Sequence, residues 1–164
     1  MLDPDSMRDS PKETGLPILY LTGVDDQGRS RVSERRELVA GADPFEALRL
    51  GPEVTTLAEG SPKVMLLESP TPPAGAIYRI YTWSPGQRSP MHRTTTTDFD
   101  VVLEGSLDMV LETETVTLHA GDCAVLPGTA HAWVSGADGA IIMYNLVAGN
   151  PSGADRDLGR VPFG

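Results

Sequence analysis

The chain has 164 residues, which is room for one domain, and it carries 23 acidic against 13 basic side chains, a net charge of -10. This balance disfavours nucleic acid and anionic membrane surfaces as partners, because both are densely negative. A single cysteine excludes an intrachain disulfide, and no apolar run approaches the length of a membrane span. We therefore expect a globular, cytoplasmic protein with no nucleic-acid and no membrane partner.

The first 61 residues are predicted to form an irregular N-terminal arm, which begins with a polar and charged segment. Residues 17–22 are a short apolar run that predicts a strand, able to pair with the edge of a neighbouring sheet. Residues 29–42 show no clear period. Asp43 is followed by a proline and, three residues after it, by a glutamate, which predicts the start of a short helix that Gly51 ends.

From residue 62 to residue 148 the pattern changes to short apolar runs separated by turn signals, and residues 149–164 form a tail. Strands are predicted at residues 63–68, 76–83, 99–103, 107–112, 116–118, 123–126, 132–134 and 140–147. Glu104-Gly105 and the stretch 135–139 are interpreted as two of the turns between them. Strands at this spacing, with no long helices between them, predict an all-β sandwich or barrel.

Two of the three histidines stand in patterns that suggest a site. In an extended chain, residues two apart share a face. One face would then carry His92, Thr94, Thr96 and Asp98, and another His131 and Trp133. Two imidazoles and a carboxylate meeting inside a barrel would hold a divalent metal with open coordination positions. Imidazole suits Fe, Ni, Cu or Zn, and the carboxylate extends the choice to Mn.

These residues resemble the two sequence motifs of the cupins, which are small jelly-roll β-barrels. The first cupin motif is matched in spacing by Gly86, His92, Thr94, Asp98 and Gly105, with threonine in place of the second histidine and aspartate in place of glutamate. The second is matched by Gly121, Asp122, Pro127, Gly128 and His131, with one residue fewer before the histidine. The resemblance covers residues 62–148. It implies a jelly-roll barrel of two antiparallel sheets, which in this family usually forms a homodimer.

The resemblance also implies a function for the pocket of the barrel. We expect an enzyme acting on a small organic molecule that is carbonyl-containing, aromatic or polyketide-like, of the oxygenase, decarboxylase, isomerase or cyclase type. His92, Asp98 and His131 would hold a divalent metal (Fe, Mn, Ni or Zn). In a version without metal, His92 or His131 would act as general base, with Asp98 orienting it. The substrate pocket would be lined by Thr94, Thr96, Met91, Tyr78 and Trp133.

Each of these assignments has a structural alternative. The two histidines would then be hydrogen-bonded barrel residues, and Asp98 would pair with Arg79 or Arg93, because a carboxylate inside a barrel needs a partner. Thr94 would hold a water or hydrogen-bond Asp98. At the level of the whole protein, the alternatives to an enzyme are a small-molecule-binding cupin without catalysis and a dimerisation domain with a filled barrel.

Overall fold

A computed structural model describes residues 15–38, 50, 54, 56–58, 60, 63–68, 71, 74–149 and 161–162. This part of the chain is built from strands and contains no α-helix, as the sequence predicts for an all-β fold. The strands are β1 (Ile18–Val24), β2 (Ser30–Glu37), β3 (Met65–Glu68), β4 (Ala76–Trp83), β5 (His92–Thr94), β6 (Thr96–Val110), β7 (Thr115–His119), β8 (Cys123–Pro127), β9 (Ala132–Ala148) and β10 (Val161–Pro162). The predicted helix at Asp43 and the start of the N-terminal arm lie outside the described residues.

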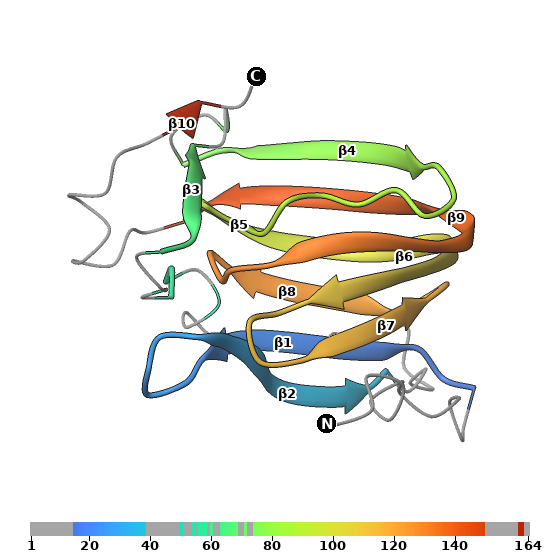
Figure 1. Ribbon diagram of the computed structural model, residues 1–164, viewed down its shortest axis with the longest axis horizontal. Coiled ribbons are helices and arrows are strands. Elements are labelled where there is room, and N and C mark those ends of the chain that lie inside the picture. Colours follow the sequence, from blue (N-terminus) through green and yellow to red (C-terminus); the bar gives the residue numbers. More distant parts are fainter. Residues whose placement is uncertain are drawn as a thin grey trace.

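The strands form two sheets in a jelly-roll arrangement (Figure 1). The larger sheet has the order β2-β1-β8-β6-β9-β4, and β7 pairs with β6 beside this path. Its pairings are antiparallel except for the parallel pair β1 and β8. The smaller sheet, β10-β3-β5, is parallel throughout, which differs from the expectation of two antiparallel sheets.

Two predicted turns are instead positions where long strands bend. The strands predicted at residues 99–103 and 107–112 are one strand, β6, and those at residues 132–134 and 140–147 are one strand, β9. The β6–β9 pairing shifts register on either side of Gly105, which has a φ of 73°. The prediction was wrong at these two points because a bulge and a turn need the same positive φ, and therefore the same glycine.

The first two strands extend the larger sheet rather than lying apart from it. β1 is buried on both faces: Ile18 and Tyr20 pack into the main core, and Leu19 packs into a second cluster on the other side of the sheet. This explains why its sequence is a continuous apolar run rather than an alternating one. β2 forms where the sequence showed no period, and its side chains alternate between less and more exposed positions although many of them are charged.

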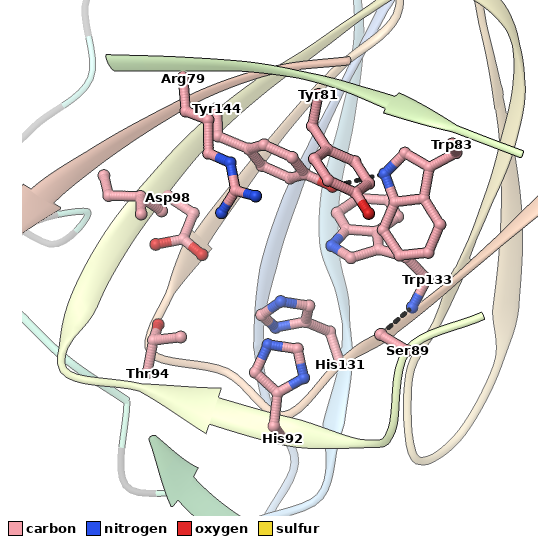
Figure 2. Close-up of a pocket in the computed structure, with 11 residues that line it drawn as sticks. Arg79, Tyr81, Trp83, Ser89, His92, Thr94, Asp98, His131, Trp133 and Tyr144 are labelled. Carbon is pink, nitrogen blue, oxygen red and sulfur yellow. Dashed lines mark hydrogen bonds between the residues drawn. The ribbon is translucent and has the colours of Figure 1, made fainter. Parts of the chain in front are cut away.

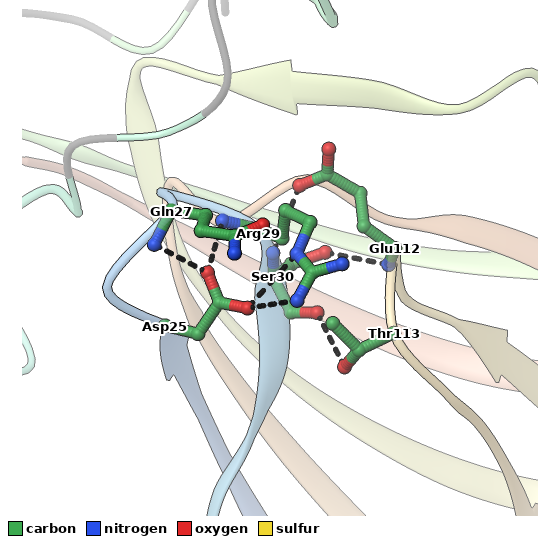
Figure 3. Close-up of polar contacts among 6 residues, drawn as sticks. All are labelled: Asp25, Gln27, Arg29, Ser30, Glu112 and Thr113. Carbon is green, nitrogen blue, oxygen red and sulfur yellow. Dashed lines mark hydrogen bonds and ion pairs between the residues drawn. The ribbon is translucent and has the colours of Figure 1, made fainter.

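The β1–β2 hairpin is fixed by a polar network that also reaches the turn between β6 and β7 (Figure 3). The Asp25 carboxylate accepts the backbone N–H groups of Gln27 and Arg29, both at 2.9 Å, and forms an ion pair with the Arg29 guanidinium. The buried Ser30 exchanges two hydrogen bonds of 2.8 Å with Glu112. These bonds satisfy backbone groups at the end of the hairpin.

The main core and a cavity share the interior of the barrel. Trp83 and Trp133 pack against the core and also line the cavity. The cavity is therefore held by the most tightly packed part of the fold rather than by surface loops. Among the described residues, no helix has the length and apolar character that crossing a membrane would require.

Candidate functional site

Two histidines from separate segments meet at the cavity. His92 begins β5, and His131 directly precedes β9. Their backbones form a bridge in which each N–H donates to the carbonyl of the other residue, both at 2.9 Å. The ring centroids lie 4.5 Å apart with the planes tilted by 54° (Figure 2). The pair of backbone hydrogen bonds thus fixes the two imidazoles side by side.

Each imidazole is also oriented by a backbone carbonyl two residues earlier. Nδ1 of His92 lies 2.9 Å from the carbonyl oxygen of Pro90, and Nδ1 of His131 lies 2.9 Å from that of Thr129. A carbonyl oxygen only accepts hydrogen bonds, so Nδ1 carries the proton in both neutral rings and Nε2 keeps a lone pair. Backbone carbonyls, and not Asp98 as expected, therefore set the tautomer of both histidines.

Burial keeps both imidazoles neutral. His131 is 2% exposed, and burial together with the neighbouring His92 lowers the pKa of His131 to about 3. Burial also lowers the pKa of His92, an effect partly offset by the hydrogen bond to Pro90. Two protonated rings this close would repel each other without water to screen them. The pair therefore offers two neutral acceptor nitrogens, with His92 the more solvated and the more basic of the two.

Two carboxyl groups of β6 are buried inside the barrel. Asp98 and Asp100 are two residues apart and point to the same side of the strand, with exposed fractions of 4% and 1%. Asp98 Oδ1 accepts a hydrogen bond of 2.6 Å from the Thr96 hydroxyl. Burial raises the pKa of Asp98 to about 7, although this hydrogen bond acts in the opposite direction. Asp98 is therefore an acid that holds or releases a proton near neutral pH.

Asp100 lies deeper, and neither of its carboxyl oxygens has a hydrogen-bond partner among the described residues. Burial, and then the charge of Asp98, raise its pKa well above the ordinary value. Asp100 does not line the cavity. Its neutral form keeps negative charge out of the barrel interior.

The wall of the cavity formed by β4 and β9 is aromatic. Inward positions on β4 carry Arg79, Tyr81 and Trp83, and β9 contributes Tyr144 (Figure 2). The Trp83 indole N–H donates to the Tyr144 hydroxyl at 2.9 Å. Burial raises the pKa of Tyr144, so this hydroxyl stays protonated. The Arg79 guanidinium lies over the Tyr81 ring, 4.9 Å from its centroid.

The cavity is partly open to solvent and has a volume of about 230 Å³. It is lined by Arg79, Tyr81, Trp83, Ser89, His92, Thr94, Asp98, His131, Trp133, Tyr144 and Leu146. An apolar cavity of about 150 Å³ holds one benzene molecule. The space therefore suits a single substituted ring or another small organic molecule of that size.

The donor atoms at the cavity do not make a three-ligand metal centre. Among the described residues, no three His, Cys, Asp or Glu side chains come together in a way that could hold a metal ion. Thr94, at the position of the second motif histidine, donates its hydroxyl to the Thr96 carbonyl at 3.3 Å. Zinc and iron centres usually take at least three protein ligands. The two Nε2 atoms alone fall short of that set, so the assignment of His92, Asp98 and His131 as metal ligands stays a prediction.

The structure brings together most of the expected site residues. His92, Thr94, Asp98, His131 and Trp133 all line the cavity.

Three other expected residues lie elsewhere. Thr96 is behind the wall, where it supports Asp98. Tyr78 is 68% exposed, because Arg79, Tyr81 and Trp83 take the inward positions of β4 and leave Tyr78 on the outer face. Met91 is half-buried and does not line the cavity.

The two arginines proposed as alternative partners of Asp98 contact other groups, namely the Tyr81 ring in the case of Arg79 and backbone carbonyls in the case of Arg93. Among the described residues, no ion pair joins Asp98 to either arginine. Arg93 is fully buried and donates to the carbonyls of Ala58 and Gly128. Sequence reasoning missed Ser89 and Tyr144 as wall residues. For Tyr144, the alternation along residues 140–147 is a signal that could have shown which side chains point inward.

Comparison with known proteins identifies a known domain in part of the chain. The family model described as a cupin domain matches residues 79–147. Phomopsin biosynthesis cluster protein C' of Diaporthe leptostromiformis is 47% identical over 62 residues, which are 37% of this chain and 33% of that protein. The cupin-domain-containing oxidoreductase srdD of Neurospora crassa is 36% identical over 63 residues, 38% of this chain and 32% of that protein. The chain thus spans about a third of the length of these curated relatives.

Solved structures give weaker likenesses. A cupin-2 domain containing protein from Shewanella frigidimarina is 21% identical, with a TM-score of 0.38 over 43% of this chain and 68% of that chain. A protein of unknown function from Rhizobium leguminosarum is 26% identical, with a TM-score of 0.42 over 44% and 70%. The sequence motifs and the matching family model thus identify residues 79–147 of this chain as a cupin domain.

Proposed function

We propose that the protein is a cupin-fold enzyme that moves a proton within a small carbonyl-containing molecule bound in the cavity. The observation that carries this proposal is that the same cavity, with a volume of about 230 Å³, is lined by an imidazole whose pKa is lowered and by a carboxyl group whose pKa is raised to about 7. Acid–base catalysis requires one group that accepts a proton and another that donates one at the same pH. Opposite pKa shifts of two neighbouring groups provide this arrangement.

The proposed reaction is an isomerisation that needs no oxidant or reductant. In a carbonyl compound with a double bond between its β and γ carbons, Nε2 of His92 removes a proton from the α carbon while Asp98 donates its proton to the carbonyl oxygen, giving a dienol. His92 then returns the proton to the γ carbon while the hydroxyl proton goes back to Asp98, so the double bond moves into conjugation and the carbonyl group is restored. His131 accepts a hydrogen bond from the substrate at its own Nε2 and positions it beside His92.

A metal-assisted reaction of the oxygenase, decarboxylase or cyclase type is a second candidate, favoured by the names of relatives. Three of them are called cupin-domain-containing oxidoreductases, and others are named as biosynthesis cluster proteins. These names support a role in secondary metabolism with a carbonyl, aromatic or polyketide-like substrate. The donor atoms of this cavity do not fit a three-ligand metal, so we derive no step through one.

Deuterium exchange tests the proton transfer directly. Phenylacetone, which has one ring and one carbonyl group, would be incubated with the protein in D₂O and followed by ¹H NMR. We expect catalysed exchange next to the carbonyl group, reduced at least about a hundredfold in His92→Gln and in Asp98→Asn. His119→Gln is the matched control, because His119 is exposed and far along the chain from both catalytic positions. Circular dichroism would confirm that each variant folds.

The outcomes separate the candidates. Exchange that is unchanged in His92→Gln would refute the assignment of the base. Binding without exchange in the wild type would favour a non-catalytic binding cupin. Activity that disappears on chelation and returns with Fe, Mn, Ni or Zn would favour the metal-assisted reaction over the one proposed.

We also propose that the protein forms a homodimer, as the family resemblance implies. Support comes from Tyr78 and Ile80, which are 68% and 65% exposed on β4, the last strand in the order of the larger sheet. Large apolar side chains on an edge strand favour association. Light scattering during size-exclusion chromatography would show a dimer mass, and Ile80→Lys should shift it toward the monomer.

A further inference from the structure

Arg79 places a positive charge at the cavity. Arg79 is an exposed residue that also lines the cavity, and its guanidinium is turned toward the cavity (Figure 2) and lies over the Tyr81 ring. Among the described residues, Arg79 makes no hydrogen bond and no ion pair. A guanidinium has five N–H donors in a planar fork and remains charged at any pH relevant to proteins. It is therefore an anion-binding group whose partner is not supplied by the surrounding side chains.

The carboxyl group that lines the same cavity does not fill this role. Asp98 is engaged by the Thr96 hydroxyl, and among the described residues no ion pair joins it to Arg79. The chain as a whole has a net charge of -10, so its long-range field repels anions. An anionic ligand would then enter only if the cavity itself supplied a cation, as Arg79 does.

The aromatic side chains that line the cavity indicate the shape of the ligand beyond its anionic group. Trp133 is in edge contact with the His131 ring, at a centroid distance of 5.8 Å, and Tyr81 is in edge contact with Trp83 at 5.5 Å. Aromatic side chains that line a cavity favour contact with a planar ring. The volume of about 230 Å³ exceeds the about 150 Å³ that holds benzene by roughly the space of a side group.

We propose that the ligand is a monocyclic aromatic carboxylate whose ring lies among the aromatic side chains and whose carboxylate binds the Arg79 guanidinium. This inference rests on the proposed function in one respect, which is that the ligand occupies the same cavity. It narrows the class of substrate from carbonyl compounds in general to those with one ring that bears an acidic group. Arg79 would set specificity, since a neutral analogue leaves the guanidinium without a partner.

The tryptophans make the binding measurable without any reaction. The chain has two, Trp83 and Trp133, and both line the cavity. Phenylacetate and its neutral isostere phenylacetamide would be titrated against the full chain, with tryptophan emission as the readout. We expect phenylacetate to bind at least about tenfold more tightly than the amide, as loss of a charge-assisted bidentate contact predicts.

Variants assign the preference to one residue. In Arg79→Gln the two probes should bind equally, whereas Arg31→Gln, which removes an exposed arginine of β2, should keep the full preference. Equal binding of the two probes to the wild type, a preference that survives in Arg79→Gln, or no binding of phenylacetate would each overturn the proposal.

The proposal and the proposed function fail in different ways. The binding assay involves no proton transfer, so its result does not depend on a catalytic base. A carboxylate preference without deuterium exchange would support the ligand assignment and refute the enzyme. Exchange with equal binding of the two probes would do the reverse.

Discussion

Replacing Asp98 by asparagine should change how stability depends on pH. Burial raises the pKa of Asp98 from 3.8 to about 7. Between these two values the folded state binds more protons than the unfolded chain, so this group lowers the free energy of unfolding as pH rises. Each pKa unit corresponds to about 1.4 kcal/mol, and the whole shift therefore to about 4 kcal/mol. The amide introduced by Asp98→Asn cannot ionise, yet its oxygen can still accept the hydrogen bond from Thr96.

The histidines have the opposite effect, which is why the comparison must be made between variants. Burial lowers the pKa of His131 from 6.5 to about 3, so this group raises the free energy of unfolding as pH rises through that interval. The effects of Asp98 and His131 partly cancel in the wild type. The difference between Asp98→Asn and wild type removes the histidine contribution and leaves that of Asp98, together with its effect on the pKa of Asp100.

Urea unfolding monitored by tryptophan emission, from about pH 4 to about pH 8, would give this difference. We expect the variant to gain stability relative to the wild type as pH rises, by up to about 4 kcal/mol. Asp138→Asn, which removes an exposed carboxyl group, controls for the change in net charge. A difference that stays constant with pH, or grows toward low pH, would show that Asp98 is not a neutral buried acid.

Three further substitutions test other features of the barrel. Asp100→Val removes a buried carboxyl group that has no hydrogen-bond partner among the described residues. We expect a higher urea midpoint and a free energy of unfolding that is about 1–3 kcal/mol higher near neutral pH. A lower midpoint would mean that Asp100 has a structural partner. Gly105→Ala should destabilise by about 2–3 kcal/mol in the same assay, because its φ is 73° and a Cβ would lie 2.2 Å from the Gly139 carbonyl oxygen. Thr94→His adds a third imidazole to the cavity and should raise zinc affinity at least about tenfold by calorimetry; no gain would mean that the three rings do not converge.

The sequence predicted the barrel strands well but could not show how they connect. Alternation along each strand is a local property, so it identified β4, β7 and β8 almost to the residue. Continuity through a bend is not local. A Cβ at Gly105 would meet the carbonyl oxygen of Gly139 on β9, and a Cβ at Gly139 would meet that of Trp83 on β4, so each position is a glycine because another backbone approaches closely. Either residue, taken alone, looks like part of a turn.

The site shows the same division. The cupin motif placed His92 and His131 at one cavity, but the carbonyls that orient them belong to backbone two residues earlier, which side-chain spacing does not reveal. The position of Asp100 inside the barrel could have been predicted from the sequence, because Asp100 is two residues after Asp98 and shares its face of the strand. The inward face of β4 could not have been predicted, because both faces of that strand carry large aromatic or apolar residues.

The interior of the barrel contains two carboxyl groups that do not stabilise the fold. A jelly roll needs apolar inward positions, and β6 supplies one at Val102, which is fully buried. The two preceding inward positions hold Asp98 and Asp100, which within the described part of the chain are supported by a single hydrogen bond from Thr96 and favour the unfolded chain as they ionise. Packing would be served better by valine at both. A pair of carboxyl groups that lowers stability, one of them at a cavity with two neutral imidazoles, is better explained by the chemistry of the cavity than by the architecture of the sheet.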